Sequence, residues 1–156
     1  MIKRLLPLAA VLALGTLAST AGAARLASVP YPCTVTSNAL LNAAFGASSD
    51  TQNFGTPGTA KSHGVAGKTC QWTYGNAQIE VTFAPSKYVP PLAAGTTTRT
   101  AAGLPPHGHL LVDRRVGNTF TAVTFVKGAR FCEVWGNASI TQAHVIKLAR
   151  ALYAKL

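Results

Sequence analysis

The side chains best suited to chemistry lie close together in "LPPHGHLLVDRR", the stretch that spans residues 104–115. His107 and His109 are two residues apart, so on an extended segment both side chains would project from the same face. Imidazole nitrogens are common zinc ligands, and Asp113 could supply a carboxylate as a third ligand. This spacing raises the hypothesis of a metal site at His107, His109 and Asp113.

Other features of the sequence argue against a catalytic or metal centre. Structural zinc sites show denser spacing of Cys and His, and the sequence contains neither HExxH nor a GxSxG elbow. Cys132 lies in "RFCEVW", a pattern typical of a core strand. We therefore expect His107 and His109 to form the polar entrance of a strand, in a non-catalytic protein without a cofactor. The alternative is a small extracellular metal-binding protein or hydrolase that uses both histidines and Asp113.

The charge of the chain favours an anionic partner. The sequence has 14 Lys and Arg against four Asp and Glu, a net charge of +10. So few acids disfavour a carboxylate-rich metal cage or the acid pair of a glycosidase. The basic residues are scattered, and only Arg114 and Arg115 are adjacent, which argues against nucleic acid as the partner. Together with Arg130, these two residues are the expected contacts to an anionic surface polymer or lipid.

The first 23 residues have the pattern of a secretory signal peptide. Lys3 and Arg4 precede a 13-residue apolar run, and "AGA" at 21–23 offers a cleavage site. Cleavage there leaves residues 24–156 as a single globular domain, with 12 basic and four acidic residues and a net charge of +8. We expect a secreted protein, or one in the space of the cell envelope, with no transmembrane helix in the mature chain.

Three cysteines in an exported chain predict one disulfide and one remaining thiol. Three pairings are possible among Cys33, Cys70 and Cys132. The bond between Cys33 and Cys70 is favoured, because it closes a separation of 37 residues over a Gly- and Ser-rich stretch. Cys132 is then either a buried apolar residue or a thiol open to intermolecular pairing.

The hydrophobic pattern predicts an α+β domain. A short helix over "TSNALLNAAFG" ends at Gly46, and "SITQAHVIKLARALYAKL" predicts a C-terminal helix with a capping box from Ser139 to Gln142. Between them, alternating residues predict about five strands with turns at Gly75–Asn76, Gly117–Asn118 and Lys127–Gly128. The sheet should be largely antiparallel, with both helices packed on it. Residues 47–68 and 86–108 are predicted to be connections.

The aromatic residues of the predicted strands allow two interpretations. They could form a stacking platform for bases or sugars, helped by Arg114, Arg115 and Arg130. The hydrophobic core is the favoured interpretation, because sheet aromatics usually pack there. The residues concerned are Trp72, Tyr74, Phe120, Phe125, Phe131 and Trp135.

The segment "PYPCTVTSNALLNAAFG", the "CQW" that opens a hairpin and the terminal "KLARAL" carry a resemblance. In these landmarks the chain resembles a family of small exported actinobacterial proteins, often lipoproteins, with a domain of unknown function. The resemblance also implies a bond between Cys33 and Cys70. The chain departs from the family by lacking a lipid-attachment cysteine and by carrying Cys132. From charge and export together, we expect a secreted protein that binds an anionic partner at or beyond the cell envelope. A secreted inhibitor or effector that docks through residues 47–68 is a further alternative.

Overall fold

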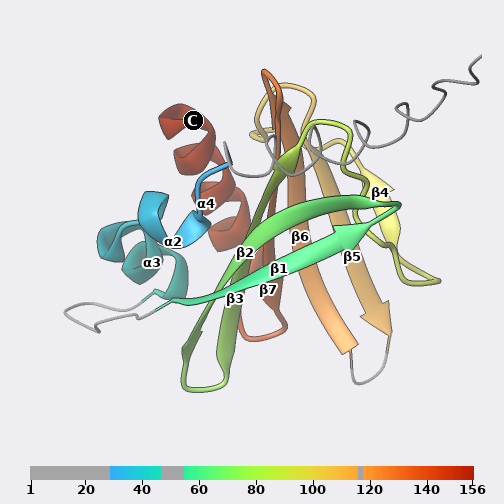
Figure 1. Cartoon of the computed structure of the whole chain (residues 1–156). Helices are drawn as coiled ribbons and strands as arrows, with labels where there is room; N and C mark the ends of the chain where they lie inside the picture. The colour runs from blue at the N-terminus through green and yellow to red at the C-terminus, as the bar shows by residue number, and fades with distance from the viewer. Residues whose placement is uncertain (1–28, 47–54, 116–117) are drawn as a thin grey trace, which may run out of the picture.

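The computed structural model describes residues 29–46, 55–115 and 118–156. It shows an α+β arrangement in which the helices gather on one side of an antiparallel sheet (Figure 1). The predicted signal peptide, residues 1–23, lies outside the described residues. The elements in chain order are α2 (Pro32–Val35), α3 (Asn38–Phe45), β1 (Thr56–Ser62), β2 (Val65–Tyr74), β3 (Ala77–Pro85), β4 (Thr97–Arg99), β5 (His109–Arg115), β6 (Asn118–Lys127), β7 (Arg130–Asn137) and α4 (Gln142–Lys155).

The sheet has seven strands in the order β1-β2-β3-β7-β6-β5-β4, not the predicted five. All neighbouring strands are antiparallel, as predicted. The sheet twists strongly, so that its edge strand β1 crosses in front of β6 and β5 in Figure 1. The central strands β3 and β7 are joined although 44 residues separate the end of one from the start of the other.

The two additional strands lie in segments that were predicted to be connections. β1 is rich in Gly and Thr, and it is a strand because it pairs along its whole length with β2, from Thr56 opposite Gln71 to Ser62 opposite Val65. His63 and Gly64, both with positive φ, form the two-residue turn between them. β4 has three exposed residues and pairs with β5 at the other edge of the sheet.

Two of the three predicted turns hold to within one residue. Tyr74 pairs with Ala77, so Gly75 and Asn76 form the predicted two-residue turn. Lys127 pairs with Arg130, which moves the third turn by one position, to residues 128–129. Residue 115 pairs with residue 118, so the second connection falls on residues 116–117, outside the described part of the chain.

Both predicted helices are present, and local signals explain their ends. α3 stops at Gly46, whose φ of 70° is the left-handed conformation that the sequence predicted. α4 is capped by Thr141, whose hydroxyl accepts a hydrogen bond from the His144 amide, so the predicted cap at Ser139 was wrong. Ile140 occupies the position between them and is buried, which ties the start of α4 to the core.

The disulfide joins Cys33 to Cys70, as predicted, with 5.4 Å between the Cα atoms. It links α2 to the middle of β2, and both Cys70 and the neighbouring Trp72 are buried. Cys132 is a free thiol that is fully buried in the same core. The first of the two alternatives for Cys132, a buried apolar residue, is therefore the one observed.

The two faces of the sheet differ in what covers them. On one, here called the helix face, the side chains of α4 pack on Val123, Phe125 and Val134 and their neighbours in the main core cluster. The other, here called the open face, has no helix packed on it in the described part of the chain. Strand alternation assigns each residue to one face, because successive side chains point in opposite directions.

Close packing of α4 on β7 depends on Gly136. A Cβ at this position would lie 2.8 Å from Val145 Cγ2 and 3.1 Å from Ile140 Cβ. We expect Gly136→Ala to lower the free energy of unfolding by about 1–3 kcal/mol, because a buried methyl would have to displace the helix. Urea unfolding measures the loss. A Gly136→Ala/Val145→Ala double variant should lose less stability than the sum of the losses in the two single variants. Strictly additive losses would contradict this packing.

No helix in the described part of the chain is long and apolar enough to cross a membrane.

Candidate functional site

The acidic and basic side chains of the described residues are separated by the sheet. Glu80, Asp113 and Glu133 are the acidic residues of this part of the chain, and strand alternation places all three on the open face. The basic strand residues with described side chains all alternate to the opposite side. They are Lys61, Lys68, Arg99, Lys127 and Arg130. Among the strand residues whose side chains are described, this face therefore carries no lysine or arginine.

Two of the acids are neighbours in the middle of the open face. Glu133 on β7 pairs with Thr82 on β3 and with Thr124 on β6, while Glu80 pairs with Trp135. Glu80 and Glu133 are therefore diagonal neighbours on adjacent strands, which corresponds to about 7–8 Å between Cα atoms. At this spacing each carboxylate lies within the electrostatic field of the other.

Burial makes these carboxyl groups weak acids. It raises the pKa of Glu133 to about 7, and the negative charge of Glu80 contributes to the same shift. Burial also raises the pKa of Glu80. The Glu133 side chain lies deep among protein atoms yet keeps part of its surface accessible. Near neutral pH it can thus hold a proton, donate a hydrogen bond or accept a cation.

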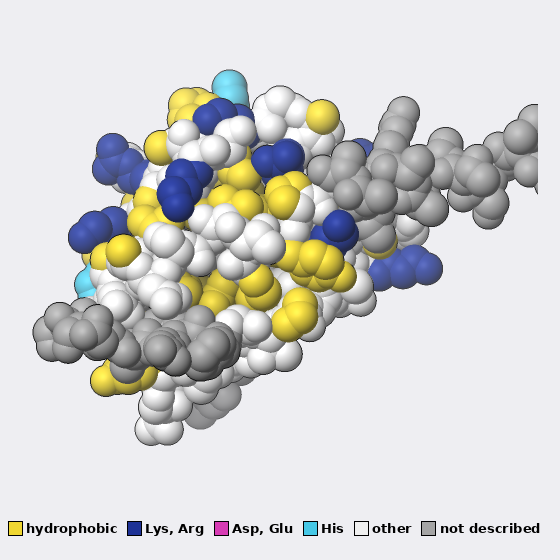
Figure 2. Space-filling model, turned by 60° about the vertical axis from the view of Figure 1, so that its left-hand side comes forward, with side chains coloured by type: hydrophobic (Ala, Val, Ile, Leu, Met, Phe, Trp, Pro, Cys, Tyr) yellow, Lys and Arg dark blue, Asp and Glu magenta, His cyan; other side chains and the backbone are white. Residues whose placement is uncertain are grey.

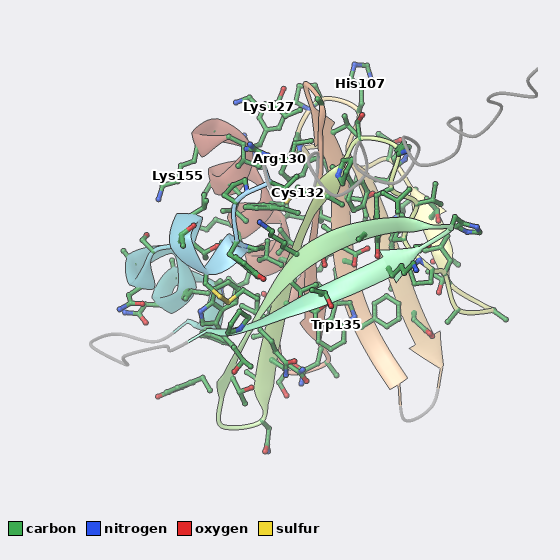
Figure 3. All side chains as sticks on the ribbon, in the orientation of Figure 1. His107, Lys127, Arg130, Cys132, Trp135 and Lys155 are labelled. Atoms are coloured by element: carbon green, nitrogen blue, oxygen red, sulfur yellow. A yellow bond between two sulfur atoms is a disulfide. The ribbon has the colours of Figure 1, made fainter. Side chains whose placement is uncertain are left out.

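Two aromatic side chains adjoin the glutamates. Burial raises the pKa of Tyr88, and the charges of Glu133 and Glu80 add to the effect, which places its phenol near both carboxyls. Tyr88 is held by Phe131, with ring centroids 5.1 Å apart. Trp135 is half-buried, and Figure 3 shows it on the side of the sheet away from the helices. We call Glu80, Glu133, Tyr88 and Trp135 the glutamate site.

The favoured core interpretation of the aromatic residues holds for some of them only. Trp72 and Phe125 are buried on the helix face. Phe131 is buried too, but in a small separate cluster on the open face. Phe120 and Trp135 contact each other at 6.1 Å on that face and are half-buried. The partly exposed tryptophan is therefore on the face that carries the acids.

The residues of the metal hypothesis are not brought together. His107 has a φ of 60° and lies in the turn that precedes β5, where the Gly108 amide bonds to the Pro105 carbonyl. The extended geometry on which the spacing argument depended is therefore wrong at His107. His109 is exposed at the first residue of β5, while Asp113 is buried four residues further along, about 13 Å away. Within the described residues, no three His, Cys, Asp or Glu side chains are grouped so as to hold a metal ion.

The three predicted arginine contacts lie at two ends of the sheet. Arg114 and Arg115 are the last residues of β5, whereas Arg130 begins β7 next to the β6–β7 turn. β6, which pairs with both strands, has ten residues between these ends, so they are about 30 Å apart. The Arg130 guanidinium lies 6.0 Å from the centre of the Phe83 ring on the helix face. A single flat contact surface does not join all three.

Several lysines on the helix side stabilise the fold directly. Lys68 Nζ donates to the Val29 carbonyl at 2.6 Å, Lys127 Nζ to the Tyr153 carbonyl at 2.6 Å, and Lys155 Nζ to the Val35 carbonyl at 3.2 Å. Lys127 thereby neutralises the negative end of the α4 dipole. Lys147 and Arg150 lie one turn apart on the exposed side of α4. Figure 2 shows Lys and Arg side chains spread over this side, with no described Asp or Glu in that view.

The proximity of Glu80 and Glu133 was missed by sequence reasoning. Each glutamate occupies a polar position in an alternating strand pattern, "QIEVTF" and "RFCEVW", and that signal was available. The two patterns lie more than fifty residues apart, and nothing local indicates that β3 pairs with β7.

Comparisons with protein-family models, with curated proteins and with solved structures gave no match to this chain.

Proposed function

We propose that this is an exported, non-catalytic binding protein whose helix side docks on an anionic polymer or lipid at or beyond the cell envelope. The segregation of charge by the sheet is the observation that carries the proposal. α2, α3 and α4 contain no acidic residue, and the described acids lie on the far face. An anionic surface that approaches the helices therefore meets cations without competing carboxylates.

The proposal assigns different roles to the basic residues of this side. Lys127 and Lys155 are held by backbone carbonyls, so they contribute fixed charge to the field. Lys147 and Arg150 are exposed on α4, and they are the side chains best placed to contact a partner directly. Arg130 adds charge at the β6–β7 turn, which Figure 3 shows near the C-terminal end of α4.

Export is part of the same proposal. The amino-terminal signal pattern supports it, as does the disulfide between Cys33 and Cys70, because such bonds persist in oxidising compartments.

A double variant that removes two positive charges from α4 tests the docking surface. We expect Lys147→Gln/Arg150→Gln to weaken binding to heparin or to phosphatidylglycerol vesicles roughly two- to thirtyfold, since an exposed ion pair contributes about 0.2–1 kcal/mol. Binding of the unaltered protein should weaken steeply as salt rises. Parallel titrations with the polymer and with the vesicles identify which of the two the surface prefers.

Lys61→Gln/Arg99→Gln is the matched control. It removes the same charge from exposed positions on the edge strands β1 and β4. It should retain most of the affinity. An equal loss in both double variants would show that net charge alone, and not the surface of α4, determines binding.

A further inference from the structure

The glutamate site has no role in the proposed docking of an anionic partner. It lies on the open face, away from Lys147 and Arg150, and its two carboxyl groups would repel an anion. In the described part of the chain no helix covers the open face, yet several side chains that alternate to it are buried, among them Thr82, Leu111, Asp113 and Ala122. Here two acids are neighbours, and the lysines and arginines of the strands whose side chains are described alternate to the other face.

Glu133 is the member of the site that most needs a partner. Its raised pKa comes from burial and from the charge of Glu80, with no hydrogen bond or cation within the described residues to offset them, and its side chain stays partly exposed. A buried carboxylate is normally paired or hydrogen-bonded, because removal from water is otherwise costly. A deep carboxylate that is both unpartnered and reachable indicates a position where something binds.

The titratable groups around Glu133 can be named strand by strand. β3 contributes Glu80, the segment after β3 contributes Tyr88, and β5 contributes His109 and Asp113 further along the face. Among its described side chains, β6 presents Phe120, Ala122, Thr124 and Val126 to this face. β2 and β1 add Thr69, Gln71 and Thr56, which carry no charge. Lys87, which directly precedes Tyr88, is an exposed cation at the edge of this neighbourhood, and the strand positions named here are acidic or neutral.

We propose that the open face binds an organic cation, with an ammonium or guanidinium group held between Glu80 and Glu133 and its carbon chain against Trp135. The carboxylates would accept the N–H hydrogen bonds of such a group as charge-assisted bonds, and Tyr88 would add a phenol oxygen. The face of a tryptophan ring is the best aromatic partner for a cation. Trp135 and Glu80 are cross-strand partners, so their side chains leave the sheet from adjacent positions on the same face.

The net positive charge of the protein does not prevent this binding. The basic strand residues with described side chains project from the other side of the sheet, and Lys87, which precedes Tyr88, is exposed to water, where salt screens its charge. The local field at Glu133 is dominated by Glu80 instead. A cation must displace any proton held by Glu133, so affinity increases as the pH rises and protons are released on binding.

The test is a nuclear magnetic resonance titration of the full mature domain with n-butylammonium at constant ionic strength. The sequence has two tryptophans, and Trp72 is buried in the core, so the Trp135 indole N–H is a specific reporter. We expect a saturable shift of this signal at pH 8 and at least a tenfold weaker apparent affinity at pH 5. Neutral n-butanol should give no saturable shift.

Variants separate this site from the docking surface. Glu133→Gln should weaken n-butylammonium binding at pH 8 at least tenfold, whereas Lys147→Gln/Arg150→Gln should leave it intact. N-butylguanidinium in a parallel titration distinguishes the two kinds of cation. The proposal is overturned if n-butanol and n-butylammonium shift the Trp135 signal alike, if Glu133→Gln binds as well as the unaltered protein, or if no saturable shift occurs. None of these outcomes bears on binding to heparin or vesicles.

Discussion

Replacement of Glu133 by Gln should make the protein more stable at pH 8, by roughly 2–3 kcal/mol, and leave its stability near pH 4.5 almost unchanged. The pKa of Glu133 is about 7 in the folded protein against an ordinary value of 4.5. Below pH 4.5 the carboxyl is protonated in both states, so the side chain costs nothing. As the pH rises from 4.5 through 7, the unfolded chain releases its proton more readily, and the folded state loses stability relative to it. Gln has nearly the same shape and no charge, so the variant lacks this loss.

Urea unfolding of the unaltered protein and the variant at several pH values between 4.5 and 8 measures the difference. Glu80→Gln is the informative control. It removes the neighbouring charge but leaves Glu133 buried, and burial is the larger cause of the raised pKa. The pH-dependent loss should therefore shrink in Glu80→Gln and persist. Parallel stability curves for the unaltered protein and Glu133→Gln would contradict the burial of an unpartnered carboxyl at this position.

Loss of the disulfide should have an effect of similar size at every pH. Cys33→Ser/Cys70→Ser should lower the free energy of unfolding by roughly 3–4 kcal/mol, because the bond restricts 37 residues of the unfolded chain. Packing adds to the cost, since Cys70 is fully buried beside Trp72. Thermal and urea unfolding report the change.

A reducing agent provides the control for the disulfide. It should destabilise the unaltered protein to nearly the level of the double Ser variant and leave the variant itself unchanged. Cys132 does not interfere, because burial raises the pKa of this thiol well above its ordinary value and its side chain is inaccessible. If reduction leaves the unaltered protein as stable as before, the proposed contribution of the bond is wrong.

Local signals in the sequence predicted those parts of the fold that local physics determines. Gly46 ends α3 because glycine tolerates the left-handed conformation, and Gly75 with Asn76 closes a hairpin for the same reason. α4 buries Val145, Leu148, Ala149 and Leu152, apolar residues that recur at helical spacing along the sequence. The choice of Cys33–Cys70 followed from chain separation and was confirmed.

The remaining parts depend on which strands become neighbours. β1 lacks the alternating apolar pattern of a strand, and only the adjacent edge of β2 makes it one. β4 has three residues and no buried side chain, so it carries no pattern at all. The glutamate site requires β3 to pair with β7, a contact between distant segments that the sequence does not encode locally. Scarcity of acids disfavoured a carboxylate-rich metal cage and the acid pair of a glycosidase, and it gave no indication that two of the four acids would be neighbours.

The central claim is that the sheet divides the protein into a cation-bearing helix side, which docks on an anionic partner, and an acidic open face, which does not. Amide chemical shifts recorded while heparin is added to the isotope-labelled mature domain test it most directly. We expect the shifted amides to cluster on α4, from Lys147 to Lys155, and at the β6–β7 turn beside Arg130. The amides of Glu80, Thr82 and Glu133 should not move. Shifts centred on the open face, or spread evenly over the chain, would contradict the division of labour between the two faces.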